Sequence, residues 1–151
     1  MASQGSEALR DGKSKPLDSK QPNDSSDMLS LSPAHAHCLD LESARSRIPG
    51  GASGVLRLAT VFRGECQNLC EQLTSNLTAN DNDEARRNAH TLKGACVLLG
   101  AKGLQTIATD IETAGREERL SDDAIASILL NDLQSETGRV LSAIDELLGK
   151  G

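Results

Sequence analysis

From residue 39 onward, apolar residues recur at spacings of three and four in one segment after another, and no stretch alternates apolar with polar residues as a β-strand does. Residues at these spacings lie along one side of an α-helix. The longest stripe, over residues 53–77, consists of Val55, Leu58, Phe62, Cys66, Leu69, Leu73 and Leu77. A helix with one apolar side has to bury that side, so the sequence predicts an all-α fold with a helical core.

Turn and cap residues divide the remainder of this region into further helices. A short helix over residues 39–48 ends before Pro49-Gly50-Gly51, which cannot continue it. Asp81 followed by Glu84 resembles a capping box, and Gly100 supplies the stop of the helix that begins there. The residues predicted to be buried in this third helix are Ala85, Ala89, Leu92, Cys96 and Leu99.

Two more helices complete the domain. One covers residues 104–117 and buries Leu104, Ile107, Ala108 and Ile111. The other follows the N-terminal cap formed by Ser121 with Asp122 and Asp123 and runs to about residue 148. Its predicted buried residues are Ile125, Ile128, Leu129, Leu133, Val140, Leu141, Ile144 and Leu148. Four amphipathic helices with short connections predict an up-down four-helix bundle, with the short helix as an extra N-terminal element.

The first 37 residues differ in character from the rest. They are rich in Ser, Asp, Lys, Gly and Pro, and their few apolar residues show no period. Such a composition cannot offset the entropy of ordering by burial, so we expect a disordered tail over residues 1–37 and a helical domain over 38–149. His35, His37 and Cys38 lie close together in sequence, but they lack a second ligand group at structural-zinc spacing, and we expect no metal site.

Composition narrows the classes of partner. The chain of 151 residues carries a formal net charge of −6 and contains no Trp, no Tyr and one Phe. Both features argue against nucleic-acid binding, because acidic surfaces repel phosphates and bases need aromatic platforms to stack on. No apolar run approaches the roughly 18 residues of a membrane span, and Met1 to Arg10 lack the apolar core of a secretion signal. We therefore expect a cytoplasmic protein without a membrane partner.

The four cysteines allow two interpretations. An even count of Cys38, Cys66, Cys70 and Cys96 indicates a disulfide framework when a chain is small and secreted. In a cytoplasmic chain thiols stay reduced, and Cys66, Cys70 and Cys96 lie in apolar stripes. We interpret these three as small buried hydrophobic residues rather than as disulfide partners.

One histidine stands apart from the core. At 100° per residue, His90 lies about 140° from the centre of its helix's apolar stripe, so it should face solvent. Lys93 at i+3 and Gly94 at i+4 share its surface. Glycine inside an exposed helix costs about 1 kcal/mol relative to alanine, and its absence of a side chain leaves the ring open to a large partner. An exposed nucleophile, an open approach and a nearby cation suit phosphoryl acceptance.

The segment Ala89-His90-Thr91-Leu92-Lys93-Gly94, continued by Gly100-Ala101, resembles the signature of histidine-containing phosphotransfer (HPt) domains. The similarity extends over the order of helices from Leu39-Asp40 to the end of the last helix. The resemblance implies a four-helix bundle whose histidine takes a phosphoryl group from the aspartate of a receiver domain, or from a histidine kinase, and passes it to a receiver. It implies His90 as phosphoacceptor, Lys93 as stabilising cation and Gly94 as the clearance position.

The resemblance also implies a residue on the following helix that hydrogen-bonds the histidine ring, and the matching residue is Glu112. Because Glu112 lies on the flank of its helix's apolar stripe, we expect a partly hydrated carboxylate that reaches across to His90. A carboxylate that accepts the Nδ1 proton leaves the lone pair of Nε2 free for attack. We therefore expect phosphorylation at Nε2.

Partners and cofactors follow from what else the sequence contains. We find no glycine-rich nucleotide loop and no kinase segment, so we expect a carrier rather than an enzyme, without a cofactor of its own and with Mg²⁺ supplied by the receiver. Arg86 and Val97 are candidate partner-binding residues, whereas Leu98 belongs either to that surface or to the core. We expect a monomer. Two alternatives stay open: a non-phosphorylated helical adaptor that docks a receiver or kinase, and a fragment of a larger hybrid kinase.

Overall fold

The computed structural model describes residues 29–149. The chain divides into two units at residue 30, and the fold below belongs to the second unit, which begins at Leu31. Its α-helices are α3 (Leu41–Arg47), α4 (Gly51–Thr78), α5 (Asn82–Leu99), α6 (Lys102–Arg116) and α7 (Asp123–Leu147), with a 3₁₀ turn, η2 (Arg119–Ser121), before α7. Residues 29–149 contain no β-strand, so the predicted all-α class is confirmed.

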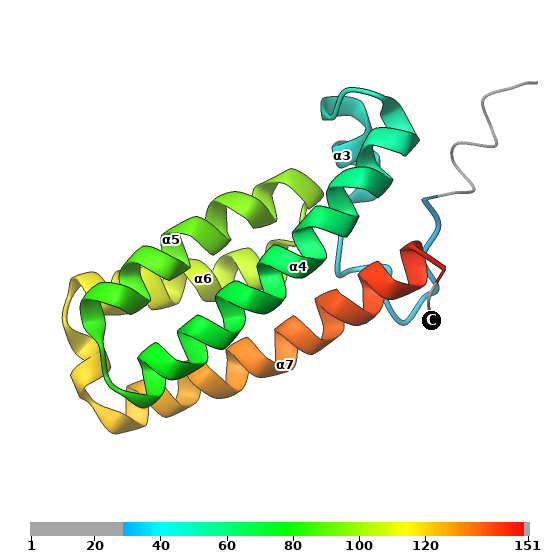
Figure 1. The fold of residues 1–151 in the computed structure, drawn as a ribbon. Helices are drawn as coiled ribbons and strands as arrows, with labels where there is room; N and C mark the ends of the chain where they lie inside the picture. Colours follow the sequence, from blue (N-terminus) through cyan, green and yellow to red (C-terminus); the bar gives the residue numbers. More distant parts are fainter. Residues whose placement is uncertain (1–28, 150–151) are drawn as a thin grey trace, which may run out of the picture. The chain divides into compact units, whose positions relative to one another are not determined.

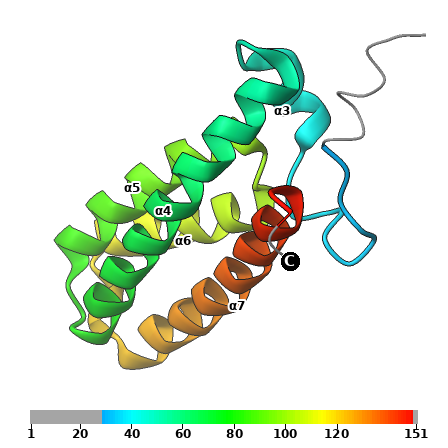
Figure 2. The same cartoon turned by 45° about the vertical axis from the view of Figure 1, so that its right-hand side comes forward.

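The four long helices form a bundle. Figures 1 and 2 show α4, α5, α6 and α7 side by side along one direction, with the short α3 at one end. Helix α4 packs against α5 and α7, while α6 packs against the same two neighbours. The most extensive contacts join α5 to α6, the two helices on either side of the short Gly100–Ala101 connection. The predicted bundle with an extra N-terminal helix is therefore confirmed.

Local signals in the sequence explain the ends of α5. The Asp81 side chain accepts a hydrogen bond from the Glu84 backbone N–H, which satisfies one of the free donors of the first turn. Gly100 ends the helix in the left-handed region at φ +68°, which glycine adopts without a Cβ clash. At α7 the cap is Asp122, whose carboxylate accepts from Ala124 N–H. Asp122 belongs to the predicted cap segment, residues 121–123, and the helix begins directly after it, at Asp123.

The core is built from the apolar stripes that the sequence predicts, together with small residues where helices approach closely. The largest fully buried side chains include Leu73, Leu77, Leu92, Leu99, Leu104, Ile111, Leu133 and Ile144. All four cysteines are free and buried. Burial raises the pKa of the Cys96 thiol to about 12, so this group stays protonated at neutral pH. The interpretation of Cys66, Cys70 and Cys96 as small buried residues is confirmed.

Some residues that the sequence assigns to the core need correction. Ile128, which the sequence assigns to the buried side of the last helix, is 60% exposed. It lies at the edge of the apolar face of α7 and lines a groove between α6 and α7. Other residues predicted to be buried are only half-buried: Leu58, Ile107, Ile125, Leu129, Leu141 and Leu148.

Part of the predicted N-terminal tail contacts the end of the bundle. The backbone N–H and the hydroxyl of Ser32 donate to Oε2 and Oε1 of Glu146 at 2.7 and 3.0 Å. Nδ1 of His35 contacts the same carboxylate. Residues 31–38, here called the N-terminal strap, are thus held against the end of α7, although residues 31–37 fall within the predicted tail over residues 1–37. Residues 1–28 of that predicted tail lie outside the described part of the chain.

No helix in the described part of the chain is long and apolar enough to cross a bilayer.

Candidate phosphoryl-acceptor site

His90 projects from the middle of α5, two turns after its N-terminal cap. Its side chain is 69% exposed, which confirms the outward placement predicted from the helical angle. Nδ1 lies 2.8 Å from Oε2 of Glu112 on α6, a normal hydrogen-bond distance. The contact that the sequence predicts between these two residues is therefore present. The imidazole is anchored along one edge and open along the other.

Glu112 is more enclosed than its sequence position indicates. Its side chain is only 11% exposed, whereas we expected a partly hydrated carboxylate. The burial is balanced by partners: Lys93 Nζ lies 2.7 Å from Oε1, and Arg116 Nη2 lies 4.0 Å from Oε2. A buried carboxylate without such partners would be strongly disfavoured in its charged form.

The charge state of Glu112 follows from these contacts. The hydrogen bond from Lys93, followed by the contact with His90, lowers the pKa of the Glu112 carboxyl below its ordinary value, against the opposing effect of burial. Glu112 is therefore a carboxylate at neutral pH and can only accept hydrogen bonds. A neutral His90 ring consequently donates Nδ1–H to Glu112 and keeps the lone pair on Nε2.

Gly94 is not required by packing. A Cβ built at this position would meet no atom within 4 Å. Since α5 is helical here and Gly94 is exposed, the protein gains no stability from the absence of a side chain. The space above Gly94 is open beside the His90 ring, as the predicted clearance position requires.

The candidate partner-binding residues lie on the same helix. Arg86 is half-buried on the preceding turn, while Val97 and Leu98 are both exposed near the end of α5. The backbone carbonyl of Val97 accepts a hydrogen bond from Arg47 Nη2, which ties α3 to this end of α5. Leu98, left open between core and surface, belongs to the surface. The binding roles of Arg86 and Val97 stay predictions.

Two residues near the site were not predicted from the sequence. Arg116 approaches Glu112 from one turn further along α6, an i,i+4 relation that the sequence does contain. Gly115 packs against α5 next to Arg86, and no sequence pattern distinguishes it from a glycine in a loop.

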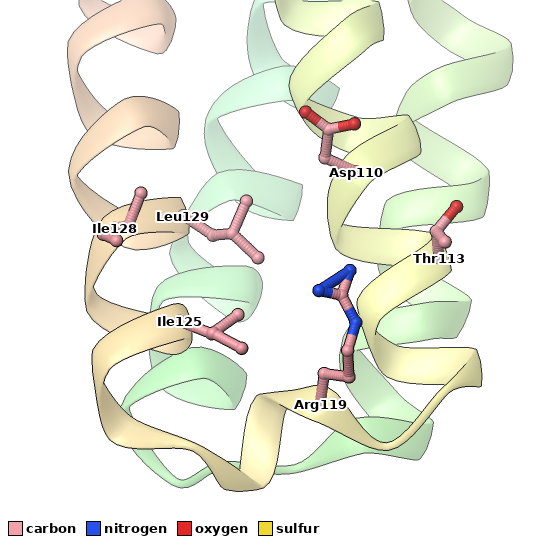
Figure 3. Close-up of a pocket in the computed structure, with 6 residues that line it drawn as sticks. All are labelled: Asp110, Thr113, Arg119, Ile125, Ile128 and Leu129. Atoms are coloured by element: carbon pink, nitrogen blue, oxygen red, sulfur yellow. The ribbon is translucent and has the colours of Figure 1, made fainter.

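A separate cavity lies between α6 and α7. It encloses about 300 Å³, and Figure 3 shows Ile125, Ile128 and Leu129 of α7 facing Asp110 and Thr113 of α6, with the Arg119 side chain extending between the two walls. The Arg119 guanidinium is paired with Glu117. None of the residues around His90 lines this cavity, so it has no part in the site above.

Comparisons with known proteins agree with this geometry. The family model of the Hpt domain matches residues 57–148, more than half of the chain. The crystal structure of histidine-containing phosphotransfer protein B (HptB) from Pseudomonas aeruginosa PAO1 superimposes with a TM-score of 0.64 at 22% identity, covering 77% of this chain and 98% of that one. No curated protein matches significantly by sequence. The chain with the exposed His90 and its carboxylate partner therefore belongs to the Hpt domain family.

Proposed function

We propose that this protein carries phosphoryl groups in a two-component phosphorelay, with Nε2 of His90 as the acceptor atom. The observation that carries the proposal is the exposed imidazole whose Nδ1 is held by Glu112 at 2.8 Å. This arrangement leaves Nε2 as the nucleophilic nitrogen of an exposed ring, and Gly94, four residues along α5, adds no side chain that would obstruct a partner. The donor is an aspartyl phosphate of a receiver domain or a phosphohistidine of a kinase, and the final acceptor is a receiver aspartate.

The transfer step can be written with these atoms. The Nε2 lone pair attacks phosphorus of the aspartyl phosphate, a N–P bond forms, and the P–O bond to the aspartate breaks with release of its carboxylate. The ring, still protonated at Nδ1, becomes positively charged as the N–P bond forms. The Glu112 carboxylate 2.8 Å away stabilises that charge without reorganisation. The reverse step delivers the phosphoryl group to a receiver.

Lys93 supports this chemistry in two ways. Its ammonium lies 2.7 Å from Glu112 Oε1 and keeps that carboxylate ionised. It also lies one turn from His90 on the same helix, where a cation lowers the cost of bringing an anionic phosphoryl group to the ring. We further propose that the chain has no kinase activity and that the Mg²⁺ needed for transfer is bound by the receiver. Arg86 and Val97 are proposed to contact that receiver.

The proposal is tested by incubating the full chain with a panel of receiver domains and kinases that carry radiolabelled phosphate. We expect acid-labile, base-stable label on the protein, mapped to His90 by mass spectrometry and chased onto an unlabelled receiver. The matched control is His90→Gln, which should keep the helical signal and lose all label, because the side chain lies outside the core. Receiver binding without label on the wild type would instead indicate a non-phosphorylated adaptor, and label retained by His90→Gln would exclude His90 as acceptor.

A further inference from the structure

Helices α5 and α6 pack closely together at a glycine. Gly115 is buried on α6, and a Cβ at this position would lie 2.7 Å from the backbone oxygen of Asn82 and 3.1 Å from Cβ of Arg86. Both atoms belong to α5. Neither is the end of a flexible side chain, so neither can swing aside. The two backbones are this close only because residue 115 has no side chain.

This close approach lies next to the candidate site. Gly115 follows Glu112 by three residues on α6, and Arg86 precedes His90 by four residues on α5, so each pair occupies one helical turn. Because the helices run antiparallel, the Gly115–Arg86 contact and the Glu112–His90 contact are adjacent contacts across one helix–helix interface. The distance between the two backbones at Gly115 therefore determines the distance that the Glu112 and His90 side chains have to bridge.

The distances show that a small separation of the helices would weaken the hydrogen bond between His90 and Glu112. With a Cβ at residue 115, the helices would have to separate by roughly 0.7 Å to bring the 2.7 Å contact with Asn82 to an ordinary 3.4 Å. With both side chains in their present rotamers, the same separation would stretch the 2.8 Å bond between His90 and Glu112 to roughly 3.5 Å, where a hydrogen bond is weak at best. The Lys93 contact would lengthen as well, since it crosses the same gap. Arg116, which lies on α6 with Glu112, would then compete for the carboxylate.

We propose that Gly115 is a positioning residue, which holds α6 close enough to α5 for Glu112 to fix the His90 ring with Nδ1 protonated and Nε2 free. The inference rests on the proposed function for its biological meaning, but its structural content is independent of it. The orientation and tautomer of the ring can be measured whether or not the protein transfers phosphate.

The test compares Gly115→Ala with Gly138→Ala. Gly138 is also helical, on α7, and a Cβ there would meet no atom within 4 Å, so this control adds the same methyl group without moving a helix. The tautomer of His90 is read from its ring nitrogen shifts by NMR in alkaline buffer, where a neutral imidazole is observed. We expect mainly Nδ1–H in the wild type and in Gly138→Ala, and a shift toward Nε2–H in Gly115→Ala. An unchanged tautomer in a folded Gly115→Ala would overturn the proposal.

A double-variant cycle separates positioning from a general loss of structure. If Gly115 acts through Glu112, a several-fold loss of phosphoryl transfer caused by Gly115→Ala should vanish in a Glu112→Gln background. Equal losses in both backgrounds would contradict the proposal. Should Gly115→Ala fold poorly, the same tautomer measurement is made in a chain that also carries Gly64→Ala and Gly138→Ala, two helical positions where a methyl group meets nothing. If wild-type protein transfers no phosphate but shows the expected tautomer shift, the proposed function fails while the positioning role stands.

Discussion

Glu112 is the residue on which the charged groups of the site converge. A single carboxylate contacts the His90 ring and the Lys93 ammonium and has Arg116 nearby, so it fixes a tautomer and balances a buried charge together. The sequence could predict that Glu112 reaches His90, because the family pattern and the helical face both indicate it. The sequence could not predict that Glu112 is buried, because its burial depends on how Lys93 and Arg116 approach the carboxylate from two different helices.

Replacing Glu112 by Gln should make the stability of the protein less dependent on pH in the acid range. The pKa of Glu112 is lowered in the folded state, so its ion pair stabilises the protein above the ordinary glutamate value of 4.5 and is lost as the pH falls through the lowered folded value. The difference in Tm between wild type and Glu112→Gln should therefore shrink on acidification from pH 7. Thermal unfolding monitored by circular dichroism measures this.

Lys93→Gln provides the matched partner variant for that experiment. Because Lys93 is the main cause of the lowered pKa, its removal should reproduce most of the pH dependence of Glu112→Gln. A difference in Tm that stays constant from pH 7 to pH 3 in both variants would contradict the assigned ion pair.

At the scale of elements, the ends of a helix are determined by neighbouring residues, whereas the burial of its face depends on how other helices pack against it. The cap of α5 at Asp81 and its stop at Gly100 are local signals, and both were predictable because each concerns only neighbouring residues. The wide apolar face of α7 is different: Ile128 lies at its edge, and whether an edge residue is covered depends on the tilt of α6. No local pattern contains that information, which is why Ile128 was wrongly placed in the core.

Gly94→Ala should stabilise α5, since an alanine Cβ meets nothing there and removes the entropic cost of a helical glycine. The expected gain is about 0.5 to 1 kcal/mol in the free energy of unfolding, measured by urea denaturation. Gly94→Leu should also fold but should lose phosphoryl transfer, because its side chain occupies the space beside the ring. A destabilised Gly94→Ala, or normal transfer by Gly94→Leu, would contradict the clearance role.

At the scale of the whole molecule, the N-terminal strap joins residues that are more than a hundred positions apart. Ser32 and His35 converge on Glu146 near the end of α7. Composition predicted disorder for residues 31–37 because they contain few apolar side chains. The contacts that hold these residues are polar and join positions distant in sequence, and amino-acid composition carries no information about such contacts.

His35→Ala should lower Tm at neutral pH, whereas His37→Ala, at an exposed position of the same strap, should not. The contacts from His35 and Ser32 lower the pKa of Glu146, so their contribution is present above the ordinary glutamate value and is lost as the pH falls through the lowered one. The Tm difference between wild type and His35→Ala should therefore narrow in acid. Equal Tm values for wild type and His35→Ala at pH 7 would show that the strap contributes nothing to stability.

The short separation in sequence between His90 and Glu112 affects how early the site is expected to form during folding. The two residues are 22 positions apart, on helices joined by a tight connection, so closing that one hairpin brings them together. Contacts that are local in sequence are expected to form ahead of distant ones. Pairing of α4 with α7, whose buried Cys70 and Thr137 are 67 positions apart, requires a longer-range search. Contact order therefore predicts that the acceptor site forms early in folding, and that the strap, with 111 positions between His35 and Glu146, closes late.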